Sequence, residues 1–355
     1  MKILHIVWGL RYGGAETMLT DIVNRQCLEH EIELLVINQD IDQDLLSQIN
    51  TRIKIHKINR PPKSKSIFYI LKLNQYILFS NADIIHFHQE NIIRYLPIYF
   101  LKRNLCLTVH DTLMDMAEVR RFKFIFAISE KVKEEVWHKA GETAILVPNG
   151  IDVQAFNKKK KFDCECFRIV QIGRLKHLHK GQHLTLKAIH RLVTHYNYTT
   201  VHLDIIGEGD SEKYLKELSD QLKINEYVTF LGAQTKNFIQ KNLTNYDLLV
   251  QPSLHEGFGL TIAEAMSAMT ATLISNVEGM KTISKNGELS YTFQSGDADD
   301  LAQKIISIIQ SSDIDRKSLV SKAYDYVAAH FDISLTADNY LSNYERILAN
   351  IKKGK

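Results

Sequence analysis

A glycine-containing loop with two carboxylates stands in the segment QPSLHEGFGLTIAE, residues 251–264. Glu256 lies in the predicted loop, and Glu264 lies in the helix that is predicted to follow. Gly257 and Gly259 allow the backbone to approach a ligand closely, and the helix start favours a phosphate or developing negative charge. A carboxylate accepts two hydroxyl hydrogens at once, which suits the diols of a sugar or a ribose. The segment predicts a sugar-phosphate site, although a helix start with a capping glutamate is the simpler alternative.

Two basic side chains follow another predicted strand, Phe167–Ile172. They are Arg174 and Lys180, and Gly181 comes next, where a helix is predicted to begin. Arginine binds phosphate oxygens in pairs and lysine acts as a compact charge, so the two would hold a diphosphate leaving group. Ordinary solvated surface cations are the alternative.

The N-terminal part of the chain offers a glycine pair and a histidine near predicted strand ends. Gly13 and Gly14 open a predicted helix, so their backbone could face a phosphate; a simple tight turn is the alternative, and the dinucleotide pattern G-x-G-x-x-G is absent. His110 ends a strand, where an imidazole could bind a sugar hydroxyl or assist a proton transfer. Because His86 and His88 are placed similarly, a structural role for His110 stays open.

Short β-branched runs alternate with helical patterns along most of the chain. This alternation predicts α/β domains of the doubly wound kind, with a parallel sheet covered by helices on both faces. The expected strands are residues 3–7, 32–37, 53–58, 84–87, 105–109, 167–172, 201–206, 228–231, 248–250 and 272–274. The expected helices are residues 13–27, 67–79, 183–194, 211–222, 238–244, 260–268 and 334–351.

The predicted elements fall into two domains of similar size. The first is expected at residues 1–155 and the second at 156–333, separated by a break after the PNG turn at 148–150 and by the charged NKKKK run at 157–161. The helix at 334–351 follows a complete second domain, so it is expected to pack back on the first. Two such domains make the cleft between them the default ligand site.

The composition is compatible with many functions. With 355 residues, 45% of them hydrophobic and 24% charged, it is an ordinary globular protein with room for two domains. A formal net charge of +3 does not indicate a nucleic-acid partner.

The cysteines and the lack of long apolar runs indicate the cellular compartment in which we expect the protein. Cys27, Cys106, Cys164 and Cys166 are too few and too scattered for a disulfide framework or a zinc site. The N-terminal segment lacks the features of a signal peptide, and no run reaches the roughly 20 apolar residues of a membrane span. We expect a cytoplasmic protein that could also associate with the inner face of the cell membrane.

Taken together, the motifs resemble family 4 of the retaining glycosyltransferases, over nearly the whole chain. That resemblance implies the GT-B architecture, with two Rossmann-like doubly wound domains facing each other across a cleft. The motifs are GGAE at 13–16, TVH at 108–110, ISE at 128–130, VPNGID at 147–152, GRL at 173–175 with KG at 180–181, IGEG at 206–209, VTFLG at 228–232, and the SLHEGFGLTIAE segment at 253–264.

The resemblance also implies a role for each matching residue. Glu256 and the neighbouring loop amides would hold the hydroxyls of the donor sugar, and Glu264 those of the ribose, while Leu231 would border the base. Arg174 and Lys180 would neutralise the departing diphosphate. The implied donor site comprises Gly13, Gly14, Arg174, Lys180, Leu231, Glu256, Gly257, Phe258, Gly259, Leu260 and Glu264, and the catalytic set comprises His110, Arg174, Lys180 and Glu256, with no metal.

In functional terms, the resemblance implies a metal-independent, retaining hexosyltransferase. The second domain would bind a nucleotide-sugar as co-substrate, UDP-sugar favoured over GDP-sugar, with no cofactor. The first would bind a glycan or polyprenyl-linked acceptor, in the synthesis of a bacterial capsule, O-antigen or exopolysaccharide. A silent nucleotide-sugar or glycan-binding protein of GT-B fold and a nucleotide-sugar epimerase of that fold are the alternatives.

Two further observations concern the substrates. The basic-apolar stretches Arg52–Lys65, Arg94–Arg103 and Arg120–Phe124 suit peripheral contact with an anionic membrane, although a solvated surface over core aromatics explains them equally well. Residues 267–271 and 278–282 depart from the glycines and prolines common in the family behind the donor loop. The sugar on the donor is therefore left open.

Overall fold

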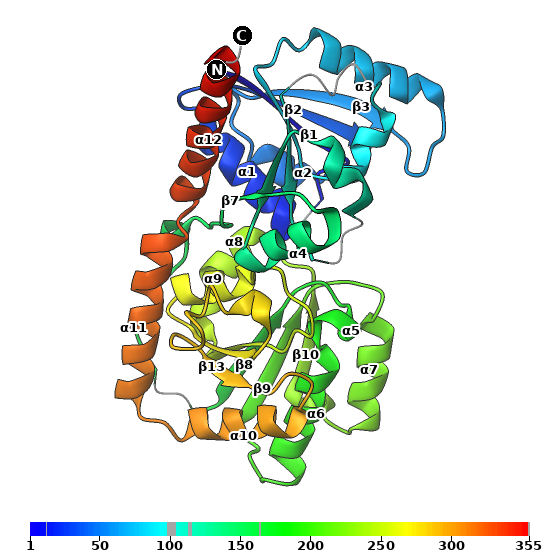
Figure 1. Cartoon of the computed structure of the whole chain (residues 1–355). Coiled ribbons are helices and arrows are strands. Elements are labelled where there is room, and N and C mark those ends of the chain that lie inside the picture. The colour runs from blue at the N-terminus through cyan, green and yellow to red at the C-terminus, as the bar shows by residue number, and fades with distance from the viewer. Residues whose placement is uncertain (12, 98–103, 113–115, 163–164, 354–355) are drawn as a thin grey trace. The chain divides into compact units, whose positions relative to one another are not determined.

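The computed structural model describes residues 1–11, 13–97, 104–112, 116–162 and 165–353 (Figure 1). Its contacts divide the chain into two units, each built on one parallel sheet. The first unit comprises Met1–Ile151 and Ile333–Lys355, and the second comprises Asp152–Asp332. The division thus falls slightly before the expected boundary, and the C-terminal segment belongs to the first unit.

The first unit has a seven-stranded sheet in the order β3-β2-β1-β4-β5-β6-β7, parallel throughout. Its strands are β1 (Lys2–Val7), β2 (Glu31–Asn38), β3 (Lys54–Arg60), β4 (Ile84–Phe87), β5 (Leu105–Val109), β6 (Phe124–Ala127) and β7 (Ile145–Leu146). Its α-helices are α1 (Gly14–Gln26), α2 (Gln43–Ser47), α3 (Ile67–Phe79), α4 (Glu130–Ala140) and α12 (Ile333–Lys353). The central strands are apolar almost without interruption because both faces of the sheet are covered.

Helix α12 lies against α1 and closes the core of the first unit. Its Tyr340 and Tyr344 are fully buried among apolar residues of the sheet and of α1. The Tyr340 hydroxyl is hydrogen-bonded to Thr108 at 2.9 Å, so the phenol does not leave a buried polar group unpaired.

The second unit has a six-stranded parallel sheet in the order β10-β9-β8-β11-β12-β13. Its strands are β8 (Phe167–Ile172), β9 (Val201–Ile206), β10 (Val228–Gly232), β11 (Leu248–Gln251), β12 (Ala271–Ser275) and β13 (Tyr291–Phe293). Its α-helices are α5 (His177–Lys180), α6 (Gln182–Thr194), α7 (Glu212–Gln221), α8 (Lys236–Asn242), α9 (Leu260–Ser267), α10 (Ala298–Ile309) and α11 (Asp313–His330). The two sheets confirm the predicted doubly wound α/β class.

The strand order of each sheet reverses at a defined point. In the first unit β1 lies between β2 and β4, and in the second β8 lies between β9 and β11. Loops that leave neighbouring strands at such a switch point diverge to opposite faces, and ligands of open α/β sheets bind in the crevice this creates at the carboxyl ends. The loops after β8 and β11 are the ones that carry the predicted cations and carboxylates.

The cysteines carry free thiols where the structure describes them. Cys27 and Cys106 are buried and Cys166 is exposed. Cys164 lies outside the described residues.

Candidate functional site

Lys180, the last residue of the short helix α5 after β8, forms an ion pair with Glu256 in the loop after β11. The ammonium of Lys180 lies 2.8 Å from Oε2 of Glu256. The same carboxylate accepts hydrogen bonds from the Ser253 hydroxyl at 3.3 Å and the Gln251 amide at 3.4 Å, and its Oε1 accepts from the backbone amide of Gly257 at 3.2 Å. The Lys180 side chain is 29% exposed and that of Glu256 12%, so the pair is held in place yet open to a ligand.

Two buried glutamines at strand ends hold this arrangement from beneath. Gln251 ends β11; its Nε2 donates to Ser253 at 2.8 Å, and its Oε1 accepts from Thr261 at 3.2 Å. Gln171, near the end of β8, donates from Nε2 to the backbone carbonyl of Lys180 at 3.0 Å. Sequence reasoning missed both residues. The sequence signal for both is a glutamine near the carboxyl end of an otherwise apolar strand, because a side-chain amide buried there needs hydrogen-bond partners.

Close backbone contacts leave room only for glycine at two positions of the second unit, one in the connection after β8 and one in the connection after β12. A Cβ on Gly181 would lie 2.0 Å from the carbonyl oxygen of Pro252, and its φ of +67° is itself unfavourable for other residues. A Cβ on Gly279 would lie 1.7 Å from the carbonyl oxygen of Glu256. Gly279 belongs to the segment that departs from the family pattern, and here it lets the segment approach the backbone of Glu256.

The other predicted residues of the second unit lie on several different elements. Arg174, after β8, is exposed and has no ion pair among the described residues. Glu264 lies on α9 and is half-buried, as is Leu231 on β10. Gly259 caps α9 with a φ of +93°.

Phe258 and Leu260 contribute differently from the polar residues. The Phe258 ring is buried and packs edge-on against Phe331 at 5.3 Å between ring centroids. It therefore anchors the loop and leaves its backbone to a ligand. Leu260 is half-buried at the first position of α9.

Gly13, Gly14 and His110 belong to the first unit. Gly13 precedes α1 in an extended conformation and Gly14 begins that helix. His110 directly follows β5. Since β1, β4 and β5 are parallel neighbours, these residues lie at the carboxyl edge of one sheet.

Burial determines the charge of His110. It lowers the pKa of this imidazole to about 4, so the ring is neutral near pH 7. Its Nε2 is hydrogen-bonded to Nδ1 of His88 at 3.3 Å. A neutral ring can exchange hydrogen bonds with a hydroxyl, and it does not act as a cation for a phosphate.

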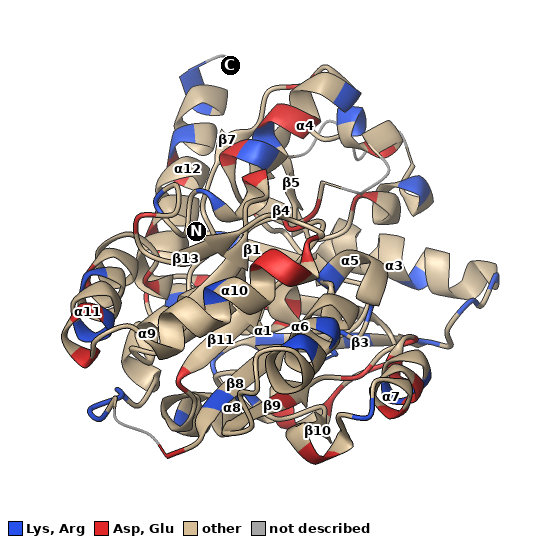
Figure 2. Ribbon diagram, turned by 90° about the horizontal axis from the view of Figure 1, so that it is seen from below, with Lys and Arg blue, Asp and Glu red and all other residues tan. Residues whose placement is uncertain are grey.

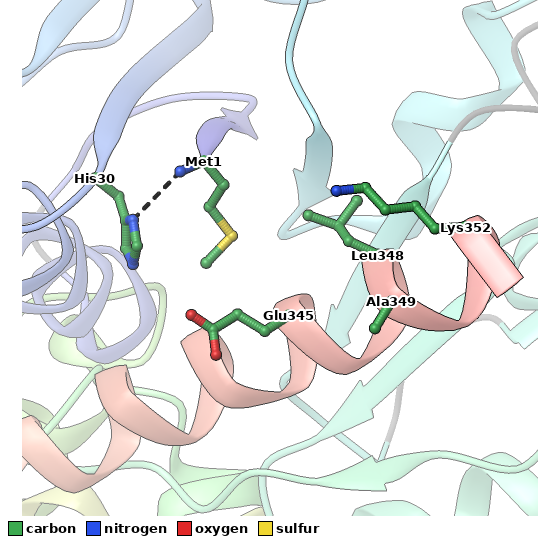
Figure 3. A pocket seen from close by; sticks show the side chains of 6 residues that line it. All are labelled: Met1, His30, Glu345, Leu348, Ala349 and Lys352. Atoms are coloured by element: carbon green, nitrogen blue, oxygen red, sulfur yellow. Dashed lines mark hydrogen bonds between the residues drawn. The ribbon is translucent and has the colours of Figure 1, made fainter.

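A pocket of about 290 Å³ lies at the other edge of the first sheet (Figure 3). It is lined by the N-terminal Met1, by His30 and by α12 residues that include Glu345 and Lys352. Because Met1 precedes β1, this is the amino edge of the strand, away from the predicted site residues.

The close contact at Gly181 generates a test of the loop pairing. Gly181→Ala should weaken ligand binding at the Lys180–Glu256 pair and lose about 3 kcal/mol or more of unfolding free energy, because the methyl group would push the Lys180 segment away from Pro252. Gly141→Ala is the matched control: its φ is +70°, but a Cβ there meets nothing within 4 Å, so it should cost only about 1–2 kcal/mol and leave binding intact. Urea unfolding measures the stability of each variant, and nucleotide titration measures its binding. Equal behaviour of the two variants would contradict the account.

Comparisons with known proteins place this geometry in a family. Residues 139–326 match the family of glycosyl transferases group 1, and residues 12–155 match Glycosyltransferase Family 4. The phosphatidyl-myo-inositol mannosyltransferase of Mycolicibacterium smegmatis is 23% identical over 293 residues, which cover 78% of this chain and 74% of that protein.

Solved structures agree in fold. HepE of Anabaena, in complex with UDP and glucose, superposes with a TM-score of 0.82 at 21% identity and covers 97% of this chain and 99% of that one. A glycosyltransferase from Rickettsia africae superposes with a TM-score of 0.80 at 19% identity, covering 98% and 99%. Two Rossmann-like parallel-sheet units of the GT-B type and the match over residues 139–326 lead to one conclusion: the chain belongs to the glycosyl transferases group 1 family and is a glycosyltransferase.

Proposed function

We propose that this glycosyltransferase transfers a sugar from UDP-sugar to a lipid-linked glycan acceptor with retention of configuration, without a metal, in bacterial surface polysaccharide synthesis. The observation that carries the donor part is the Lys180–Glu256 pair at the switch point of the second sheet. A cation for the diphosphate and a carboxylate for hydroxyls stand side by side there. In support, the structural neighbour HepE was crystallised with UDP and with UDP-glucose.

The ion pair is compatible with a bound diphosphate. An ammonium has three N–H donors, so Lys180 can keep Glu256 as a partner and still donate to a phosphate oxygen. Arg174, which is exposed in the same connection after β8, would add a forked donor. Both cations would act most strongly as the bond from the anomeric carbon to the phosphate oxygen breaks, since negative charge then accumulates on the diphosphate.

The proposed reaction needs no protein nucleophile. The acceptor hydroxyl oxygen bonds to the anomeric carbon on the face that the diphosphate leaves, and its proton passes to the departing phosphate oxygen. A retaining glycosidase would instead use a free carboxylate as nucleophile. The Glu256 carboxylate already has four protein partners, which suits binding and orientation of sugar hydroxyls.

The remaining residues take the roles that the family resemblance implies. Glu264 on α9 would bind the ribose hydroxyls, and Leu231 would border the uracil. From the first unit, the backbone at Gly13 and Gly14 would serve the phosphate, and His110 would bind a hydroxyl as a neutral ring.

Substitutions at two of these residues should separate donor binding from turnover. Glu264→Ala should raise KM for the UDP-sugar, because ribose contacts exist before and during reaction. Arg174→Ala should mainly lower kcat, by about 10²–10³-fold, since one electrostatic donor to the developing charge is worth that much. Initial rates of UDP release measure both effects.

Arg191→Ala is the matched control for charge removal. Arg191 is a half-exposed arginine of the same unit whose ion pair with Asp299 joins α6 to α10, so its loss should leave kcat and KM unchanged. Negligible effects of both site substitutions would contradict the role assignment. Tight UDP-sugar binding without release of UDP would favour a silent binding protein.

The first unit carries an exposed apolar helix face that supports a membrane-bound acceptor. Helix α3 contains one lysine and no acidic residue, and its ribbon is almost uncoloured in Figure 2. Its exposed side chains recur at helical spacing, so they share one side of the helix. They are 47–70% exposed and comprise Ile67, Phe68, Leu71, Leu78 and Phe79.

Basic residues border this face at the β3–α3 connection. Lys63 and Lys65 lie there with Arg60, and all three line a pocket of about 310 Å³ whose walls also include Trp8 and Tyr69. Such a mixture fits an anionic membrane, where each lysine or arginine near the surface adds about 1 kcal/mol. Within the described part of the chain, every helix is too short or too polar to cross a bilayer.

The other two basic-apolar stretches offer less than their sequences indicate. Arg94 and Arg121 both form ion pairs with Glu118, at 2.9 Å each. Phe122 is buried. Residues 98–103 of the Arg94–Arg103 stretch lie outside the described residues. The proposed membrane contact therefore rests on α3 and the lysines before it.

Co-sedimentation with vesicles tests the membrane part. Wild-type protein should pellet with vesicles that contain anionic phosphatidylglycerol, and a Phe68→Ser, Leu71→Ser double variant should stay in the supernatant because the apolar anchor is lost. Ile314→Ser is the control, since Ile314 is 80% exposed but lies in the second unit. Activity on a short water-soluble acceptor should be equal in all three. Wild-type protein that does not pellet would overturn this part of the proposal.

A further inference from the structure

A row of histidines runs through the core of the first unit and ends at His110. It begins at Gln26 on α1, whose Oε1 lies 2.9 Å from Nε2 of His5 on β1. Nδ1 of His5 lies 3.1 Å from Nε2 of His88, directly after β4. Nδ1 of His88 in turn lies 3.3 Å from Nε2 of His110. Each imidazole is thus joined to the next through opposite ring nitrogens, and the rings of His5, His88 and His110 stack in sequence.

Burial keeps all three imidazoles neutral. It lowers the pKa of His5 and of His110 to about 4 and that of His88 well below its ordinary value. A neutral imidazole carries one N–H donor and one acceptor nitrogen. The hydrogen bonds of the row must therefore all point in the same direction.

The carboxamide oxygen of Gln26 sets that direction. In the carboxamide orientation of this structure, Oε1 faces His5 and Nε2 is buried without a hydrogen-bond partner among the described residues. The oxygen can only accept, so the hydrogen of His5 is on Nε2 and its Nδ1 accepts from Nε2–H of His88. Nδ1 of His88 then accepts from Nε2–H of His110. This leaves Nδ1 of His110 as an acceptor, and that atom is buried with no hydrogen-bond partner among the described residues.

The neighbouring groups do not interrupt the row. His86 lies beside it but uses its own partners: Nε2 is 2.8 Å from the Thr108 hydroxyl, and Nδ1 is hydrogen-bonded to Tyr344. The titratable groups that face the row are His86, Cys106, Tyr340 and Tyr344, and no carboxylate or cation among the described residues shifts the pKa of its histidines.

A metal ion is the other explanation for clustered histidines. Ring nitrogens of His5, His86 and His88 lie within 4.8 Å of one another. However, the nitrogens that would face an ion already hold hydrogen bonds to each other or to Thr108 and Tyr344. The cluster is therefore better explained as a hydrogen-bonded network.

We propose that Gln26, His5 and His88 form a positioning relay that holds His110 as its Nε2–H tautomer, so that Nδ1 accepts a hydrogen bond from a substrate hydroxyl. The three residues do not touch substrate; they act through His110. An unpaired buried acceptor discriminates strongly against a ligand that lacks the matching donor. The relay thus makes the site selective for a sugar that carries a free hydroxyl at that position. The identity of the ligand rests on the proposed function, but the tautomer does not.

Nitrogen NMR of the histidine rings tests the relay directly. In wild-type protein labelled with ¹⁵N-histidine at pH 7.5, His110, assigned by the signals lost in His110→Gln, should show a protonated Nε2 and an unprotonated Nδ1. Gln26→Met removes the acceptor at nearly constant volume, so His110 should become a mixture of tautomers. A protonated Nδ1 or a mixture in the wild type would overturn the proposal, whatever the enzyme's activity.

Kinetics supply the second readout, with a matched control. Gln26→Met should lower kcat/KM about ten- to a hundredfold, by analogy with the loss of a residue that orients a metal-bound histidine. His86→Phe keeps the stacked ring but lies outside the relay, so it should leave the His110 tautomer and kcat/KM unchanged at matched melting temperature. Equal losses of kcat/KM in Gln26→Met and His86→Phe would mean that Gln26 has only a structural role, which would contradict the relay. If the wild type shows the expected tautomer but releases no UDP from any UDP-sugar, the proposed function fails and the relay stands.

Discussion

The site of the second unit depends on one constraint: the loops after β8 and β11 must lie in direct contact. Only then can Lys180, from one loop, reach Glu256, from the other. The parallel pairing of β8 with β11 brings the loops together, and Gly181 permits the final approach to Pro252 because it has no side chain. The buried glutamines at the two strand ends then hydrogen-bond the loops to the sheet. Together these features hold a cation and a carboxylate next to each other while both side chains stay partly exposed.

Much of this could be predicted from the sequence, and the reasons are physical. Buried parallel strands are continuous apolar runs, so β8 and β11 were recognisable, and the glycines, cations and carboxylates that follow them indicated a phosphate and sugar site. What the sequence does not reveal is which polar groups share hydrogen bonds. In the sequence, Gln171 and Gln251 are ordinary polar residues, and only the structure shows that both are buried.

Elements with weak periodicity were missed for a similar reason. The buried residues of helix α11 recur at helical spacing, but they comprise only Arg316, Val320, Ala323 and Val327, so the apolar stripe is narrow and gives a weak signal in the sequence. Strand β6 has only four residues and begins inside the basic stretch Arg120–Phe124, so its apolar run is too short to predict a strand; the buried Phe122 fits the interpretation of this stretch as a solvated surface over core aromatics. In the first unit, the sequence singled out His110 and left its role open. The row of rings behind it becomes visible only when β1, β4 and β5 lie side by side.

The central claim is that the second unit binds a nucleoside-diphosphate sugar through the paired loops, and thermal unfolding with a panel of nucleotides tests it most directly. A ligand that binds only the folded protein raises the melting temperature, by an amount equivalent to about 2.7 kcal/mol at a hundredfold excess over Kd. We expect UDP and at least one UDP-sugar to raise it more than GDP and GDP-sugars, and Lys180→Met to abolish that increase. An unchanged melting temperature with every nucleotide and nucleotide-sugar would contradict the account.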